Sequence, residues 1–306
     1  MKNIQDLKAE IEKIFADGVN FEVFLGVEEG GQLVYLKGDL DNESTRGICV
    51  TYIESIRSFF ANDVLTTLPL SEVDARSDVL LGYDLPDKPA DFNVLEVLLA
   101  TVQIADFSFD NHEISDVKSI AIRISSATSK VLFFKQMYPV SYVKQNQIMI
   151  WKAGDRLKYL GGDVLKISGG FDLILFDNYF YINGFKKFEK SFKFDVIAKK
   201  IQMQTSRDII ALNIVDDVKS YLINGDAPQK DLLRVAKSEV LALPPATILH
   251  FALSIQGKLG FHIVNNRIQL NSRDSVKKLI KLLNDDYLQS ALTQNDYDSL
   301  AKNKIA

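Results

Sequence analysis

The chain has 306 residues, of which 47% are apolar and 25% charged, a composition typical of globular proteins with a substantial core. Its single cysteine, Cys49, excludes an internal disulfide framework and suits a reducing cytosol. The three histidines, His112, His250 and His262, lie too far apart for zinc-ligand spacing. We expect His250 and His262 to be hydrogen-bonded structural residues.

The net charge of −4 conceals a strong contrast between two parts of the chain. Residues 1–116 carry 8 Lys and Arg against 23 Asp and Glu, whereas residues 117–306 carry 28 against 17. This contrast favours contact of the second part with nucleic acid or another anionic surface, while the acidic part shields it or keeps the protein in solution. The alternative is that two domains simply compensate each other's charge.

The first 116 residues alternate between helical and strand patterns. We expect a helix over 4–15, a hairpin of strands over 21–27 and 33–36, a helix over 42–60, irregular acidic loops over 65–90, a helix or strand over 94–102, and a domain boundary in the acidic segment 106–116. These features predict an acidic N-terminal α/β domain over residues 1–116, used for assembly.

Strand patterns follow the boundary. We expect strands over 117–125, 130–136 and 147–151, then a hairpin of 171–176 and 179–182 that turns at Asp177-Asn178. Seven cations lie along or beside these strands: Arg123, Lys130, Lys135, Lys144, Lys152, Arg156 and Lys158.

The remainder of the chain is predicted to be mostly helical. We expect helices over 185–193, 196–203, 209–223 and 229–243, a buried uncharged run over 240–257 broken by a loop at Pro244-Pro245, a strand pair over 260–264 and 267–270, and a helix capped by Ser272. The predicted class is therefore α+β, with a basic C-terminal domain over residues 117–306 that combines a mainly antiparallel sheet with packed helices.

The helix predicted at 185–193 has two distinct faces. Phe185, Phe188 and Phe192 follow the i, i+3, i+7 spacing of a buried face, and its lysines cluster about 150° away. One interpretation is a solvated amphipathic helix. The other is a phosphate-binding surface anchored by aromatic packing, joined by a second basic helix near 273–281. The candidate DNA contacts are Lys186, Lys187, Lys190, Lys193, Lys199, Lys200, Arg273, Lys277, Lys278 and Lys281.

Catalytic motifs are nearly absent from the sequence. Neither a phosphate-binding P-loop nor a nucleophile elbow occurs. Asp208 with the D-x-K at 217–219, and Asp106 with the D-x-K at 116–118, loosely fit a Mg²⁺-dependent nuclease, but the segment of Asp217 is expected to be helical, whereas such carboxylates usually follow a strand. We therefore predict a protein that is not an enzyme, with no cofactor and no metal.

Part of the chain resembles a known family. The stretch S-I-A-I-R-I-S at 119–125, the hairpin at 171–183, the helix F-x-x-F-E-K-x-F at 185–192 and the amphipathic tail resemble the DUF4868 family over residues 117–306. Within that family the acidic N-terminal part and the total length are similar to the branch found in Kiwa anti-phage systems.

The resemblance implies a function. It implies a cytoplasmic bacterial defence protein that binds duplex DNA, blocks phage DNA replication or expression, and is peripheral to the inner membrane through a small integral membrane partner of the KwaA type. It also implies self-association, and closed two-fold symmetry favours a homodimer or a larger oligomer built from dimers. The alternatives are a Mg²⁺-dependent nuclease effector and a structural adaptor for the membrane partner.

Overall fold

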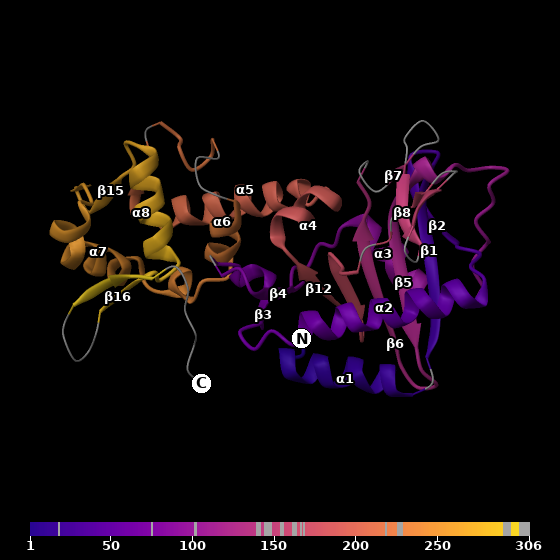
Figure 1. Cartoon of the computed structure of the whole chain (residues 1–306). Helices are drawn as coiled ribbons and strands as arrows, with labels where there is room; N and C mark the ends of the chain where they lie inside the picture. Colours follow the sequence, from indigo (N-terminus) through magenta and orange to yellow (C-terminus); the bar gives the residue numbers. More distant parts are fainter. Residues whose placement is uncertain are drawn as a thin grey trace. The chain divides into compact units, whose positions relative to one another are not determined.

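The structure is a computed structural model with two compact units, and its fold is α+β as predicted (Figure 1). The first unit holds Met1–Thr67, Asp78–Gly82 and Pro89–Phe192, and the second holds Leu68–Ser77, Tyr83–Lys88 and Lys193–Ala306. The backbone is described for residues 1–17, 19–74, 76–100, 103–138, 142–143, 149–153, 156–160, 164–165, 167, 169–217, 219–224, 229–289 and 295–299.

One eight-stranded sheet forms the centre of the first unit. Its strands follow the order β2-β1-β5-β6-β11-β12-β4-β3, and neighbours from β2 to β4 pair antiparallel. Their bounds are β1 Asn20–Glu29, β2 Gln32–Lys37, β3 Thr66–Pro69, β4 Val79–Gly82, β5 Val117–Ser125, β6 Lys130–Gln136, β11 Leu173–Phe176 and β12 Tyr179–Asn183. The sheet therefore combines strands from before and after residue 116. The division into an assembly domain and a DNA-binding domain at that residue stays a prediction.

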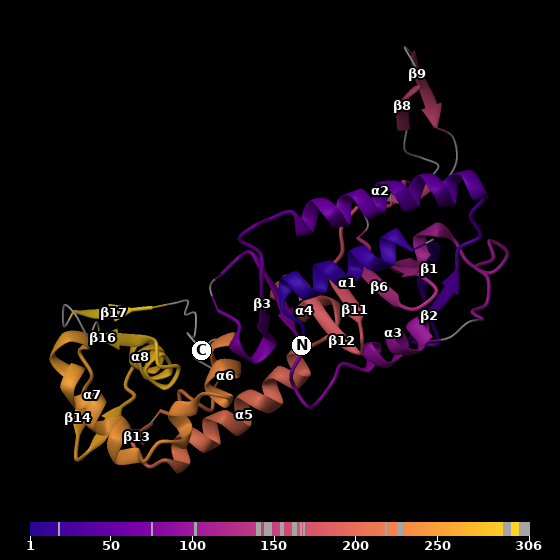
Figure 2. The same cartoon turned by 90° about the horizontal axis from the view of Figure 1, so that it is seen from below.

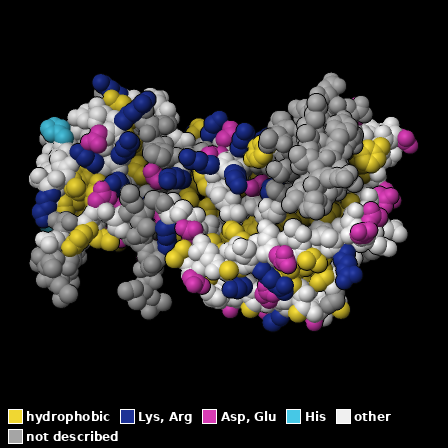
Figure 3. All heavy atoms as spheres, in the orientation of Figure 1, with side chains coloured by type: hydrophobic (Ala, Val, Ile, Leu, Met, Phe, Trp, Pro, Cys, Tyr) yellow, Lys and Arg dark blue, Asp and Glu magenta, His cyan; other side chains and the backbone are white. Residues whose placement is uncertain are grey.

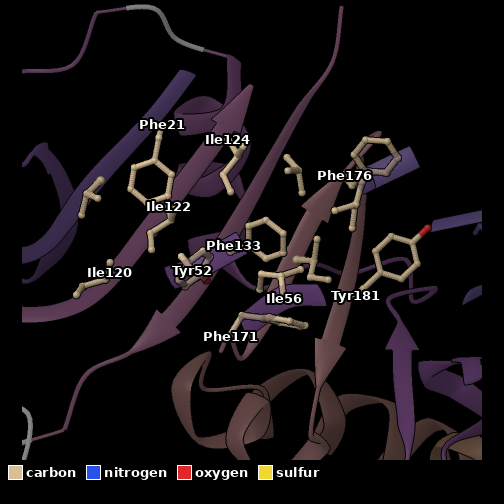
Figure 4. Packing of buried hydrophobic residues seen from close by; sticks show 14 of the residues in the cluster. Phe21, Tyr52, Ile56, Ile120, Ile122, Ile124, Phe133, Phe171, Phe176 and Tyr181 are labelled. Atoms are coloured by element: carbon tan, nitrogen blue, oxygen red, sulfur yellow. The ribbon is translucent and has the colours of Figure 1, made fainter. Parts of the chain in front are cut away.

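Helices cover both faces of this sheet. They are α1 Ile4–Ala16, α2 Asn42–Phe60, α3 Ala90–Ala100 and α4 Phe185–Ser191. Figure 2 shows α2 and α3 on opposite sides of the strands. Because successive strand residues point to opposite faces, alternate side chains of each strand supply each core layer. Ile120, Ile122 and Ile124 of β5 enter the layer of α1 and α2 with Tyr52 and Phe133 (Figure 4).

The opposite layer is rich in aromatic residues. Phe92 of α3 stacks on Phe180 of β12 with ring centroids 3.7 Å apart. Phe188 and Phe192 pack against the Phe92 ring at 6.0 and 5.3 Å, which fixes α4 to the sheet. Tyr181, the neighbour of Phe180, belongs to the other layer, as expected from strand alternation.

The predicted hairpin at residues 171–182 is confirmed. Phe176 pairs with Tyr179, and the two turn residues, Asp177 and Asn178, have φ values of 51° and 61°. Positive φ at both central positions is the backbone of a type I′ turn, which Asp and Asn tolerate well. The strand predicted at 147–151 overlaps β8 Met149–Ala153. The first two residues of that prediction lie outside the described backbone.

Smaller strand pairs complete the first unit. β8 pairs with β9 Arg156–Leu160, and β7 Tyr142–Val143 pairs with β10 Val164–Leu165. Of the seven strand cations, Lys144 and the side chains of Lys152, Arg156 and Lys158 lie outside the described residues.

The second unit is mainly helical around small strand pairs. Its elements are α5 Asp195–Ala211, β13 Val215–Asp216, α6 Gln229–Ala236, α7 Pro245–Leu259, β14 Ile263–Val264, β15 Arg267–Gln269, α8 Arg273–Leu283, β16 Tyr287–Gln289 and β17 Asp296–Asp298, with short 3-10 turns at Leu70–Glu72 and Glu239–Ala242. Its core contains Ile209, Leu232, Ile248, Ile268 and Leu279, so the helices and the β13-β15-β14 sheet share one interior.

Two helix predictions in this unit are wrong in extent. Residues 196–203 are helical as predicted, but α5, which contains them, ends at Ala211 and is followed by β13, which pairs parallel with β15, so no helix spans 209–223. The helix predicted at 229–243 ends at Ala236. Asn213, with φ 57°, follows the end of α5. The run at 240–257 is interrupted at Leu243 and Pro244, as predicted: a 3-10 turn, Glu239–Ala242, precedes them, and α7 begins at Pro245, where a missing N–H costs no helical hydrogen bond. Residues 242–247 are exposed rather than buried.

The fold redistributes the charge contrast. Counted by compact unit, the first carries 18 Lys and Arg against 24 Asp and Glu, and the second carries 18 against 16. The net charges of −6 and +2 differ far less than those of residues 1–116 and 117–306. Electrostatic arguments about this protein therefore belong to local clusters rather than to whole domains.

Candidate nucleic-acid interface

Three candidate lysines lie on α4 in the first unit. Gly184, with φ 98°, turns the chain from β12 into this helix. Lys186, Lys187 and Lys190 are all exposed on it. Figure 3 shows lysine and arginine side chains gathered over α4.

Aromatic side chains hold α4 in place beneath these lysines. Phe188 is 1% exposed and Phe192, which caps the helix, is 5% exposed. Phe185 is only half-buried, so the buried face is narrower than the spacing predicts. The helix nevertheless presents ammonium groups to solvent from an aromatic base.

Asp172 organises the charges beside α4. This carboxylate is 5% exposed and accepts the Gln136 N–H at 3.0 Å. Lys187 pairs with it at 3.3 Å. A buried carboxylate therefore holds one of the candidate lysines where the central strands β6 and β11 end and begin.

Lys135 of β6 belongs to the same cluster. Its Nζ donates to the Gly169 carbonyl at 3.2 Å. Burial lowers the pKa of Lys135, the Asp172 carboxylate opposes this shift, and Lys187 adds to it. Beside this group, the Nζ of Lys190 lies 5.7 Å from the centre of the Tyr138 ring, within the range of a cation–π contact.

Sequence reasoning missed this cluster. In the sequence, Lys135 is one of seven strand cations with nothing to distinguish it. The role of Asp172 has no local signal either, because only the pairing of β6 with β11 brings Asp172 to Gln136, 36 positions away.

The next three candidates lie at the start of the second unit. Lys193 follows α4 with φ 48°. Lys199 pairs with Asp195 one turn earlier at 3.3 Å, and Lys200 pairs with Asp87. All three lysine side chains are exposed.

The last candidates lie on α8. Ser272 caps this helix by accepting the Ser275 N–H at 3.2 Å, and the two residues form a capping box. Buried Val276, Leu279 and Ile280 fix its inner face, as predicted. Arg273 and Lys277 are exposed, whereas Lys278 pairs with Asp274 at 2.8 Å and Lys281 pairs with Asp298.

At least five of the ten candidates thus have a carboxylate partner in the described part of the chain. Ion pairs of this kind on a surface are weak, with free energies of roughly 0–1 kcal/mol. A phosphate group can therefore compete for Lys199, Lys200, Lys278 and Lys281 at little cost. Lys187 differs, because its partner Asp172 is buried.

Asp217 and Asp116, two of the four carboxylates of the possible nuclease motifs, have local structural partners. Asp217 accepts the N–H groups of Tyr221 and Leu222 at 2.8 and 2.9 Å. Asp116 closes a capping box with Glu113. Within the described residues, no group of three or more His, Cys, Asp and Glu could hold a metal ion. The absence of enzymatic activity stays a prediction.

The histidine prediction is wrong for two positions. His250 and His262 are both exposed, because α7 and the β14 region present them to solvent. His112 pairs with Glu29 at 3.2 Å and packs against the Phe107 ring. Cys49 is half-buried, and burial raises the pKa of its thiol.

Comparison with known proteins gives a family. The sequence model of the Kiwa protein KwaB-like family matches residues 114–293, more than half of the chain. The chain belongs to the Kiwa protein KwaB-like family. Kiwa protein KwaB of Escherichia coli O55:H7 (strain RM12579 / EPEC) is 25% identical over 315 residues, an alignment that covers 98% of each chain. No solved structure matches.

The KwaB-like segment includes every candidate contact, from Lys186 to Lys281. Membership of a Kiwa family supports a role in anti-phage defence. In the part of the KwaB-like chain that the structure describes, no helix is long and apolar enough to cross a membrane.

Proposed function

We propose that this protein acts in anti-phage defence by binding duplex DNA through phosphate contacts. Its membership of the Kiwa protein KwaB-like family supports the defence role. The observation that carries the DNA contact is α4, where lysines project from a helix anchored by Phe188 and Phe192. A fixed row of ammonium groups suits the phosphate backbone, because phosphates are recognised without regard to sequence.

The protein then acts by occupying DNA rather than by cutting it. Bound along phage duplex DNA, it blocks replication or expression. It works in the cytoplasm, at the inner membrane through an integral membrane partner of the KwaA type, and as a homodimer or larger homo-oligomer. A single species of monomer mass in light scattering at micromolar concentration would contradict the last point.

The DNA contact is tested by salt dependence. Anisotropy of a labelled mixed-sequence duplex, titrated at several salt concentrations, gives a log–log slope of about −0.9 for each phosphate neutralised. In Lys186→Ala/Lys190→Ala, affinity falls for all sequences alike, and the slope becomes shallower by about 0.9 for each phosphate that is no longer neutralised. The same measurement on Arg273→Ala/Lys277→Ala tests α8 separately.

A matched variant controls for overall charge. Lys13 and Lys118 are exposed lysines of the same unit outside α4. Lys13→Ala/Lys118→Ala removes two charges as well, and its affinity and slope remain close to those of the unchanged protein. If the α4 variant and this control bind alike, α4 does not contact DNA.

The nuclease alternative has its own test. With Mg²⁺ or Mn²⁺, the purified protein leaves plasmid and linear DNA intact. Metal-dependent nicking that disappears in Asp217→Ala, with the variant still folded by circular dichroism, would replace our proposal with the nuclease.

A further inference from the structure

A second feature suited to DNA lies in the second unit. A pocket of about 570 Å³ opens beside α7 and the β16–β17 hairpin. This volume falls within the roughly 300–1,000 Å³ usual for ligand sites. Its walls include Phe251, Lys258, Tyr287, Leu288, Asn295 and Tyr297.

The pocket exposes large apolar side chains. Tyr297 is 52% exposed, and Phe251 and Leu288 are each 38% exposed. Tyr287 forms the floor, since it is 7% exposed and packs edge-on against Phe261 at 6.4 Å. Exposed aromatic groups that gather round a cavity mark a binding surface rather than scattered surface residues.

The wall of the pocket includes one cationic side chain that can contact a phosphate. Lys258 brings one positive charge to the wall. Asp298, the only acidic residue of the wall among those described, is already paired with Lys281 of α8. That ion pair also joins the hairpin to the helix that carries Arg273 and Lys277.

Aromatic faces beside an ammonium group match one chemical class of ligand. A nucleotide has a planar ring that stacks on tyrosine or phenylalanine and a phosphate that binds lysine. Duplex DNA offers phosphates but keeps its bases stacked inside, so it makes no use of exposed rings. An unpaired base at a strand end or gap offers both groups.

We propose that this pocket takes one unpaired nucleobase of a DNA strand whose phosphates lie on α8. The base stacks on Tyr297 and Phe251, and Lys258 contacts the adjoining phosphate. The inference rests on the proposed DNA binding and deepens it, because it makes strand ends and gaps preferred sites on otherwise sequence-independent DNA.

The test compares a blunt duplex with the same duplex carrying a single-stranded overhang. The unchanged protein binds the overhang duplex tighter by roughly tenfold, the effect of one stacked base. Phe251→Ala/Tyr297→Ala removes this preference and leaves blunt-duplex affinity unchanged. Tyr297→Phe keeps the preference because it keeps the ring.

Further arms separate the possible failures. Tyr179→Ala removes an exposed ring of the first unit and leaves the preference intact. Equal binding of both duplexes by the unchanged protein would overturn this inference but not the proposed function. No binding to blunt duplex, with overhang binding preserved, would overturn the proposed function alone. Saturable binding of deoxyadenosine monophosphate in dialysis, abolished in Phe251→Ala/Tyr297→Ala and without any overhang preference, would assign the pocket to free nucleotides instead.

Discussion

Individual buried charges hold the first unit together. Arg123 of β5 is 4% exposed and lies opposite Glu22 of β1 in the sheet register. Its guanidinium donates to that carboxylate at 2.7–2.8 Å and to the Leu98 carbonyl at 2.7 Å, over the face of Phe24. Arg123, one of the seven strand cations, is therefore buried and links the sheet to α3.

Removing this link destabilises the fold. Arg123→Met removes the donor to the Leu98 carbonyl and leaves Glu22 with only its more exposed cation, Lys37, and breaking a buried pair from one side costs about 3–5 kcal/mol of unfolding free energy. Arg57→Met, which breaks the exposed pair with Glu12, costs less than about 1 kcal/mol. Urea denaturation of both variants checks this, and equal losses would show that Arg123 is not such a link.

Asp231 makes stability depend on pH. Burial raises the pKa of its carboxyl above the ordinary value. The folded state then holds this proton more tightly than the unfolded chain, so stability falls as pH rises from the unfolded pKa through the folded one. Asp231→Asn removes that loss. The variant melts higher at pH 7, and the difference disappears in acid below both pKa values. A wild-type melting curve that shows the same pH dependence as the variant would contradict this.

Residue roles of this kind are hard to predict from sequence. The lysines of α4 and α8 follow from helical spacing, because the signal is local. Asp172 and Arg123 depend on strands that meet only in the folded sheet. The periodicity of apolar residues does not predict which strands pair, so the cluster at Asp172 could not be predicted from the sequence.

Among whole elements, prediction succeeded where local signals agree. The strands β5 and β6 and the helix α2 have the bounds expected from alternation, turn residues and caps. It failed around β13, whose two residues are strand only because β15 lies beside them. The ten candidate contacts stay predictions, although the buried face of α8 is as expected and α4 exposes its lysines, with a buried face narrower than expected.

The helix α4 allows a graded test of its aromatic anchors. Phe188→Ala removes a fully buried ring and costs about 3–5 kcal/mol of unfolding free energy. Phe185→Ala costs less, because that ring is half-buried. Thermal and urea unfolding of the two variants measure the difference. Similar losses of unfolding free energy in the two variants would mean that Phe185 is packed as fully as Phe188, contrary to its half-buried position.

The whole molecule combines segments that are distant in sequence. β4 lies next to β12, and β1 next to β5, so the central sheet needs strands from both sides of residue 116. The charge contrast between the two parts of the sequence diminishes for the same reason, since acidic and basic segments share one unit.

A fragment tests this interdependence. Residues 117–306 alone lack β1 and β4, which leaves the edges of β5 and β12 unpaired and their apolar faces without α1 and α2. We expect this fragment to aggregate or to lack dispersed amide signals in NMR spectra. A soluble fragment with a cooperative melt would show that the second part of the chain folds by itself.

The pairing of β1 with β5 also sets an order of events during synthesis. β1 leaves the ribosome with β2, but its other neighbour follows roughly 90 residues later. At about 5–20 residues per second, the nascent hairpin waits for some 5–20 s with one edge open. During that interval the first unit is a substrate for chaperones, and pauses in translation between codons 30 and 117 would lower the yield of folded protein.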